Sequence, residues 1–415
     1  MNLRRITAGG LVALASAIRA SAGAQLAAPA HTSRRLTLAQ ALRQAEQSNT
    51  DVLLAASALD SARADRRAAG ALPNPVLGGS PNTPYQYVAS IPLDITPQRF
   101  SRIAVANAGA SAVAHDAQDV KRQVTLSVAR AFYDALLAEK KLEIARDRRD
   151  AIARVLQSDS VRFRAGDVPE RNIGRSEIEL TRADADVSRA SVDVTESRIT
   201  LQLAMGIAHA DSTVGVDGTL AYRRVEPMSD SLLAIAHVYR ADLAAAADRI
   251  EQSDDQRHLA SSLVIPTPQV SIVRQFSAPF GNGNFYSLGL SFEVPVLNQY
   301  RADRERAAAG ATAARLSARR TQAQVERDVL TAITEFHAAR DRAEQYCGPV
   351  TKSAAAVDAA RYAYAKGASS LLEVLDALRV VQDVQVEYVT ALHDYWVSAS
   401  ALDAAVGKDI LGMRE

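Results

Sequence analysis

One long stretch of the chain carries a helical pattern of apolar residues, and a second long stretch is predicted to be its copy. Between positions 99 and 163 the apolar residues step by seven and then repeatedly by four, which is typical of a helix that packs along other helices. This stripe consists of Val113, Val120, Val124, Val128, Phe132 and Leu136. No proline interrupts the stretch, so it predicts one helix about 98 Å long. The second stretch, 299–365, contains Gly348-Pro349, which predicts a kink or a break there.

Short segments with an alternating pattern precede both long helices. Residues 73–97 and 266–296 hold most prolines of the body of the chain. Apolar and polar residues alternate most regularly over 269–274 and 286–294, and a loop sequence rich in glycine and asparagine separates these two runs. Each segment therefore predicts a β-hairpin, which gives about four strands per chain.

Two further helices flank these elements in each half of the chain. One precedes the hairpin: a helix over 38–70 capped by Thr37, and its counterpart from Ser229 or Ser231 to about 263. The other follows the long helix after a tight glycine turn, over 171–206 in the first half and 371–407 in the second. A glycine ends each of these final helices, as expected for a helix C-terminus.

The same order of elements thus occurs twice, and matching fragments support an internal duplication. Residues 131–133 resemble 334–336, 163–166 resemble 364–367, and 201–206 resemble 402–407. Several matches in the same order indicate two tandem repeats. We place the first repeat at 36–210, a connector at 211–228 and the second repeat at 229–408, with an N-terminal segment at 25–35 and a tail at 409–415.

Composition and charge exclude several classes of protein. The chain has 48 basic and 47 acidic residues, a balance without the basic excess of a nucleic-acid-binding protein. A single cysteine, Cys347, excludes a disulfide framework within the chain and a cysteine-rich metal site. The sequence has no uninterrupted apolar run of about 18 residues, so it predicts no transmembrane helix.

The N-terminus has the layout of a secretory signal peptide. Arg4 and Arg5 precede a mildly apolar run over 6–18, and small residues follow as far as Ala24. We therefore expect a signal peptide over 1–24 and export of the remaining chain.

The predicted strands pose a physical problem if they enter a membrane. Four strands are too few to close a barrel, because the smallest barrels need about eight. An open sheet edge in lipid would leave unpaired backbone groups at several kcal/mol each. Membrane hairpins would therefore require several copies that share one barrel. In the alternative, both hairpins pack on the helices as a small sheet.

The order of elements resembles that of the TolC-type outer-membrane efflux proteins over about 36–410. The matching pieces are residues 36–42, Pro73-Asn74-Pro75, residues 295–298, and Gly367 followed by residues 371–377. The last piece is similar to the family's Gly-x5-[DE]-V-L-D-A segment. The two proline-containing pieces are most similar to the branch that serves heavy-metal cation pumps.

This resemblance implies a mainly α fold with a small β part. Tandem-duplicated long-helix hairpins would form an α-helical barrel, and four strands per chain would contribute to a shared trimeric 12-stranded transmembrane β-barrel. The protein would lie in the outer membrane of a Gram-negative-type bacterium and extend into the periplasm.

The resemblance also implies a function and partners. A homotrimer would dock on a periplasmic adaptor (a membrane fusion protein) and an inner-membrane RND-type pump, with outer-membrane lipid around it and no nucleic acid. Heavy-metal cations are the implied cargo, and drug efflux or type I polypeptide secretion are alternatives. An exported coiled-coil scaffold without a pore is a second alternative. We expect no cofactor.

Two carboxylates near the second glycine turn are candidate gate residues. Glu373 and Asp376 are three positions apart and therefore share one helix face. In a trimer they would form a ring of six carboxylates, and the resemblance places this ring, with Tyr364, at the periplasmic gate. The alternative is a solvated pair of carboxylates that stabilises the helix N-terminus.

The two glycine turns are the candidate adaptor-docking tips, again by resemblance. Their residues are Arg164, Gly166, Asp167, Gly367 and Ser369. Some family members carry arginine where this chain has Ser369. The seven histidines are scattered without a zinc motif, and neither a phosphate-binding loop nor a nucleophile elbow occurs. We therefore expect neither a metal site nor catalysis.

Overall fold

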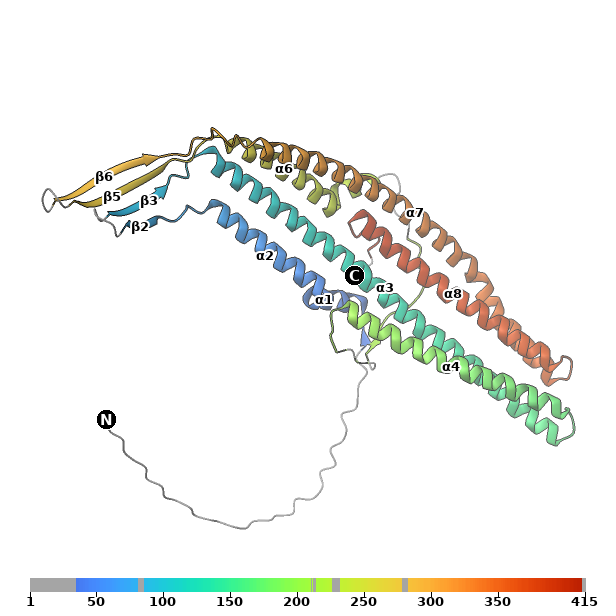
Figure 1. Cartoon of the computed structure of the whole chain (residues 1–415). Coiled ribbons are helices and arrows are strands. Elements are labelled where there is room, and N and C mark those ends of the chain that lie inside the picture. Colours follow the sequence, from blue (N-terminus) through green and yellow to red (C-terminus); the bar gives the residue numbers. More distant parts are fainter. Residues whose placement is uncertain are drawn as a thin grey trace, which may run out of the picture.

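The computed structural model describes residues 35–80, 86–209, 211, 214–225, 232–277 and 283–412. These form an elongated molecule with a sheet at one end and helices over the remaining length (Figure 1). The expected signal peptide, nearly all of the 25–35 segment, both candidate serine caps of the second repeat and the last residues of the tail lie outside the described residues. The boundaries assigned to the two repeats stay predictions.

Two very long helices run along the molecule, as the sequence predicts. They are α3 (Pro97–Arg164) and α7 (Arg301–Ala365). The helices α4 (Glu170–Ala204) and α8 (Leu371–Val406) run back beside them, α4 against α3 and α8 against α7.

A kink or a break was expected in the second long helix, and no break occurs there, because α7 continues through Pro349. One missing backbone donor is tolerated since buried residues anchor the helix on both sides of the proline. Ala343 belongs to a buried cluster before it, and Val357 belongs to another after it. Packing over these flanking turns outweighs the local cost of the proline.

Each helix expected before a hairpin is instead a pair of helices. In the first repeat these are α1 (Leu38–Ser48) and α2 (Thr50–Gly70), and in the second α5 (Leu232–Tyr239) and α6 (Ala241–Ser262). At the first break Asn49 has extended backbone (φ −65°, ψ 128°). Its side-chain oxygen accepts hydrogen bonds from the backbone of Asp51 (2.9 Å) and Val52 (3.3 Å) and thereby caps α2.

The final glycine of each repeat packs into the break. A Cβ on Gly206 would lie 2.3 Å from the carbonyl oxygen of Ser48, and a Cβ on Gly407 would lie 2.9 Å from that of Tyr239. Both glycines also have positive φ, 82° and 80°. Each repeat therefore closes its last helix onto its first pair of helices through a backbone contact that a side chain would block.

The four main strands form one antiparallel sheet in the order β2-β3-β5-β6. They are β2 (Val76–Ser80), β3 (Gln86–Pro92), β5 (Gln269–Ser277) and β6 (Gly283–Ser291), and all fall within the two expected hairpin segments. Pairing of β3 with β5 joins the hairpin of one repeat to that of the other. Within the described residues, β2 and β6 pair on one side only.

A second, very small sheet was not expected from the sequence. The two-residue strands β1 (Arg35–Leu36) and β4 (Gly215–Val216) pair in parallel and bring the connector back to the start of the first repeat. Val216 is buried in the same cluster as Phe132, Leu136 and Met205. This pair therefore holds the connector against the middle of α3.

Two clusters of buried residues each lie mainly within one repeat, and a third cluster near the glycine turns joins the two repeats. One cluster centres on Phe336, Tyr395 and Leu402 of the second repeat, and another on Phe132 and Leu136 of the first. The helix α3 also packs against α6 and α8 of the second repeat. Over the described residues, no helix has an apolar stretch long enough to cross a membrane.

Candidate channel wall, gate and docking tips

The two faces of the four-stranded sheet differ in chemistry. The register places one set of apolar side chains on one face, and each of them is exposed in the single chain. This set contains Leu77, Tyr87, Ile91, Ile272, Tyr286, Leu288 and Leu290. Such an exposed apolar face on a small sheet is typical of the lipid-facing side of a transmembrane barrel.

The opposite face carries mostly uncharged polar side chains. Strand alternation places there Gln86, Ser90, Gln269, Ser271, Gln275, Ser287 and Ser291, among a few apolar residues. In a barrel this face would line the lumen. The hairpins do not pack back on the helices as in the alternative considered above, because the sheet extends away from the helices (Figure 1).

Both glycine turns lie at the end of the molecule farthest from the sheet (Figure 1). Gly166 (φ 87°) and Gly367 (φ 74°) adopt left-handed backbone, and neither would meet another atom within 4 Å if it carried a Cβ. Backbone conformation alone therefore requires glycine at these turns. Arg164 donates to the carbonyl oxygen of Ser160 (3.2 Å) at the end of α3, and Asp167 is exposed in the turn.

Tyr364 connects the two helical hairpins just above the turns. It is buried, and its hydroxyl donates to Oδ1 of the fully buried Asp159 on α3 at 2.6 Å. Ser176 of α4 donates to the other carboxylate oxygen at 3.4 Å, and the guanidinium of Arg162 lies 5.2 Å from the centre of the tyrosine ring. Burial and the hydrogen bond to Asp159 raise the pKa of Tyr364 to about 12, so the hydroxyl remains a donor.

The two candidate gate carboxylates are exposed in the single chain but differ in their contacts. Ser370 caps α8, since its hydroxyl oxygen accepts from the backbone of Glu373 (3.4 Å) and its hydroxyl donates to Glu373 Oε1 (3.1 Å). Ser370 is therefore the cap of α8, and the carboxylate of Glu373 contacts this cap. Asp376 lies one turn further along α8 and is exposed.

Sequence reasoning named Tyr364 and missed its partner Asp159. It also named Ser369, whose hydroxyl lies 3.5 Å from the carbonyl oxygen of Ala360 within its own helical hairpin. The contact between the two hairpins thus runs through Tyr364 and Asp159, which are 205 positions apart. The sequence did not indicate that Asp159 is buried, because an aspartate within a helical pattern is usually exposed.

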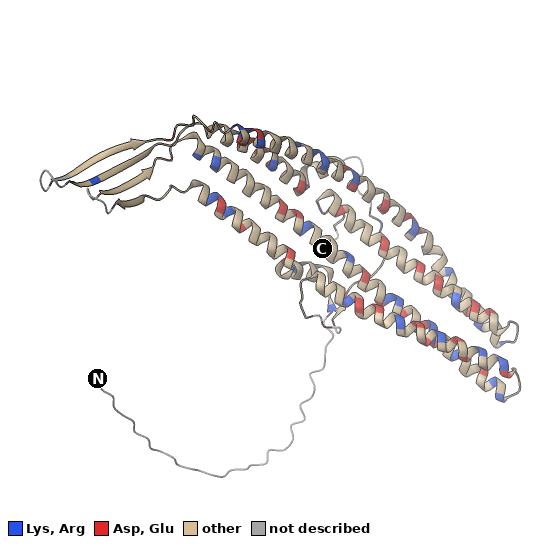
Figure 2. Ribbon diagram, viewed as in Figure 1, with Lys and Arg blue, Asp and Glu red and all other residues tan. Residues whose placement is uncertain are grey.

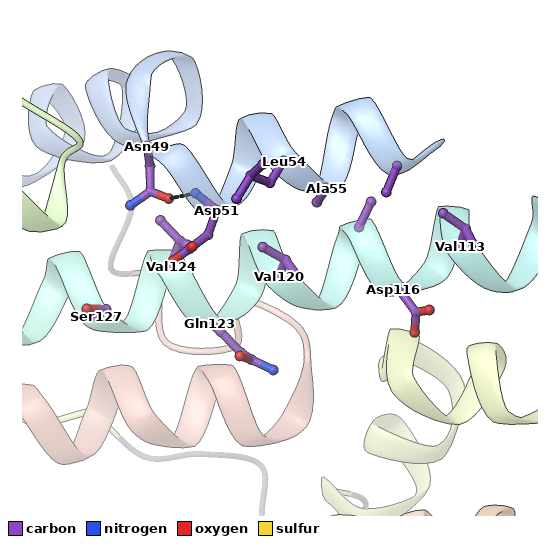
Figure 3. Close-up of a pocket in the computed structure, with 12 residues that line it drawn as sticks. Asn49, Asp51, Leu54, Ala55, Val113, Asp116, Val120, Gln123, Val124 and Ser127 are labelled. Carbon is purple, nitrogen blue, oxygen red and sulfur yellow. Dashed lines mark hydrogen bonds between the residues drawn. The ribbon is translucent and has the colours of Figure 1, made fainter. Parts of the chain in front are cut away.

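An open groove of about 730 Å³ lies between α2 and α3 (Figure 3). Leu54, Val113 and Val120 line it, and the carboxylates of Asp51 and Asp116 lie beside it. Asp116 is paired with Arg249 of α6. No group of three or more metal-ligating side chains occurs in the groove or elsewhere in the described residues.

The sequence matches the model of a known family over both repeats. Residues 41–207 and 232–408 each match the outer membrane efflux protein family. The chain belongs to this family. Each matched segment contains one set of helices and one hairpin of the sheet, so the duplicated long-helix architecture is the family's own.

Individual relatives agree with this assignment. The chain is 23% identical over 395 residues to the cobalt-zinc-cadmium resistance protein CzcC of Cupriavidus metallidurans, covering 92% of both chains. It is 23% identical over 327 residues to the outer membrane protein TolC of Vibrio cholerae, covering 75% of this chain and 74% of TolC. The Campylobacter jejuni CmeC outer membrane channel has a similar structure, with a TM-score of 0.77 and 13% identity over 91% of this chain and 86% of CmeC.

These findings confirm the mainly α fold, the outer-membrane location and the efflux-channel class. Four strands per chain contribute to a trimeric 12-stranded barrel, and the helices continue this barrel into the periplasm. Channels of the family dock with an adaptor and an inner-membrane pump. The proteins matched are channels rather than enzymes.

Proposed function

We propose that three copies of this chain form the outer-membrane exit of a tripartite pump that expels heavy-metal cations. The observation that carries this proposal is the similarity to the cobalt-zinc-cadmium resistance protein, which extends over 92% of both chains. An uncharged polar lumen face is compatible with such cargo, because it neither traps cations nor repels them. A periplasmic adaptor and an RND-type inner-membrane pump would complete the assembly.

Metal tolerance of the host tests the cargo. A strain without this chain should lose tolerance to cobalt, zinc or cadmium several-fold, and a plasmid copy should restore it. Tolerance to an organic cation such as ethidium should stay unchanged. Loss of ethidium tolerance or of polypeptide secretion, with normal metal tolerance, would contradict the proposal.

We also propose that Glu373, Asp376 and Tyr364 form the periplasmic gate. Tyr364 supports this role because it ties the second helical hairpin to the first beside the turns. Across a three-fold axis, two carboxylates about 10 Å apart repel by roughly 0.4 kcal/mol in water and about 1.7 kcal/mol at an effective dielectric of 20. A ring of such groups would attract cations to the entrance and hold them there.

Single-channel recording tests the carboxylate ring. The double variant Glu373→Ala, Asp376→Ala should conduct more than the wild type and lose block by divalent cations. The control is Asp193→Ala, Glu196→Ala, which removes two exposed carboxylates with the same spacing from the middle of α4. Equal conductance and equal block in all three proteins would refute the gate.

We assign adaptor docking to the two turns, with Arg164, Gly166, Asp167, Gly367 and Ser369. Their place at the far end of the helices supports this assignment. A photocrosslinking residue at Asp167 or Ser369 should capture the adaptor in living cells, whereas one at Asp193 should not. Capture from all three positions alike would argue against docking through the tips.

A further inference from the structure

One charged residue interrupts the otherwise uncharged sheet. Arg274 of β5 is the only charged residue in the four strands of the barrel wall that the structure describes (Figure 2). The register pairs it with Tyr87 of β3 and Tyr286 of β6. Arg274 therefore lies on the apolar, lipid-facing side of the sheet, with a tyrosine on the strand at each side.

Aromatic rings surround the guanidinium. Its central carbon is 4.5 Å from the ring centre of Phe276 and 5.7 Å from that of Tyr286. The Tyr87 ring meets Phe276 edge-on at 6.0 Å. Two rings thus contact the guanidinium and the third, Tyr87, supports Phe276 from the next strand. Cation–π attraction to Phe276 and Tyr286 holds the guanidinium in this aromatic cradle.

Among the residues that the structure describes, no carboxylate pairs with this cation. None of the ion pairs among the described residues includes Arg274, and its neighbours across both ladders are tyrosines. The Nε atom is buried without a hydrogen-bond partner. Arginine on the lipid face of a barrel costs about 2–4 kcal/mol at the middle of the bilayer and about 0–1 kcal/mol near its surface. Its position along the strand therefore decides whether it is tolerated.

Arg274 lies near the end of β5 that is remote from the helices. It precedes the last residue of the strand, Ser277, by three positions, or about 10 Å. Ile272, Leu288 and Leu290 continue the apolar band toward the helical end. Since the helices extend into the periplasm, the remote end faces the outside, and Arg274 lies nearer to the outer end of β5 than to its periplasmic end.

We propose that Arg274, cradled by Tyr87, Phe276 and Tyr286, binds a phosphate group of a phosphorylated outer-leaflet lipid. The guanidinium presents paired N–H donors that fit two phosphate oxygens, and a partly desolvated site strengthens this bond. The acyl chains of the same lipid would cover the apolar band over Ile272 and Leu288. The trimer has three such sites, one on each chain.

Native mass spectrometry of the delipidated trimer tests this site. The probes are diphosphorylated lipid A, the same lipid with both phosphates removed, and inorganic phosphate. Wild-type trimer should bind up to three phosphorylated molecules and few dephosphorylated ones. Arg274→Gln should lose most of this binding, and Arg274→Lys should retain part of it because lysine keeps the charge but not the paired donors.

The control is Arg301→Gln, which removes an exposed arginine at the start of α7, beside the other end of the sheet. It should bind the lipid as the wild type does. Equal binding of phosphorylated and dephosphorylated lipid by the wild type would overturn the proposal, even if Arg274→Gln failed to form trimers. Displacement of the lipid by an equal concentration of inorganic phosphate would also overturn it, since the site would then recognise the free anion.

Discussion

At the scale of single residues, His393 joins the two repeats. Its ring lies on α8, with Nε2 2.7 Å from Oδ1 of Asp134 on α3 and Nδ1 3.1 Å from Oδ1 of Asp394. Burial alone would lower the pKa of His393, but the hydrogen bonds to Asp134 and Asp394 outweigh burial and raise it above 6.5. The folded protein therefore favours the protonated ring.

This shift predicts a stability that depends on pH. A group with a raised folded-state pKa contributes stability below its unfolded pKa, and the contribution disappears as the pH rises through the folded value. His393→Gln should therefore lower the melting temperature of the trimer at about pH 5.5 and have less effect at about pH 8.5.

Thermal melting in detergent at both pH values measures this difference. The control His337→Gln removes a histidine that packs on Phe336 and has no carboxylate partner among the described residues. It measures the cost of removing a histidine ring that makes no ion pair between the repeats. An effect of His393→Gln that grows with pH would contradict the sign of the shift.

The sequence allowed prediction of some residues in the contact between hairpins but not of others. Tyr364 followed from the resemblance of the glycine turn to the family's segment. Asp159 did not, because a single aspartate among the many charged residues of α3 looks solvated. Asp159 is buried where Ser176 of α4 and Tyr364 of the other repeat reach it, and the helical periodicity of one stretch does not specify which residues of other helices will cover it.

At the scale of elements, the packing of a glycine against a helix break closes each repeat. Gly206→Ala should destabilise the protein strongly, because its Cβ would meet the carbonyl oxygen of Ser48 at 2.3 Å and its φ is 82°. Gly166→Ala meets no atom within 4 Å and has a φ of 87°, so it should cost only the backbone strain of about 1–2 kcal/mol.

The heat-induced loss of trimer on gels compares these two variants directly. Both carry the same substitution at similar backbone angles, so the difference reports the steric contact alone. Trimers of Gly206→Ala should dissociate at a clearly lower temperature than those of Gly166→Ala. Equal dissociation temperatures would show that the contact with Ser48 relaxes at little cost.

The helix breaks themselves were not predictable from local sequence. Asn49 is compatible with a helix interior at modest cost, and apolar residues continue on both sides of it. Its cap depends on partners far away in the chain, since its side-chain nitrogen donates to the carbonyl oxygen of Ala204 at 2.8 Å. Local propensity similarly overstated the effect of Pro349, where distant packing preserves the helix.

At the scale of the whole molecule, the two faces of the sheet predict opposite effects for the same substitution at two neighbouring residues. Leu288 is 78% exposed on the apolar face, and Ser287 lies on the polar face. Leu288→Arg should cost about 2–4 kcal/mol per chain if it lies at mid-bilayer. Ser287→Arg should be tolerated, because its charge would enter the aqueous lumen.

Two measurements separate these variants. The yield of heat-resistant trimer in the outer membrane should fall for Leu288→Arg and stay near the wild-type level for Ser287→Arg. Bilayer recordings of Ser287→Arg should shift ion selectivity toward anions. If both variants assembled equally and neither changed selectivity, the assignment of lipid and lumen faces would be wrong.

The need for several copies followed from the sequence by counting strands, whereas the arrangement of the strands did not. Each hairpin was evident from its alternation and its loop. That β3 pairs with β5 depends on how the two repeats lie beside each other, which α3 determines through its contacts with α6 and α8. Hydrophobic alternation predicts which face of a strand is apolar, but it does not predict which strands pair with each other.

The ladder between β3 and β5 has a consequence for biogenesis. Its two strands lie more than 170 positions apart, one in each repeat, so a ribosome completes β3 long before β5 exists. During export the outer edges of both strands of the first hairpin therefore remain unpaired, and exposed strand edges favour aggregation. The edge of β3 is therefore covered only after the second half of the polypeptide has arrived to supply β5.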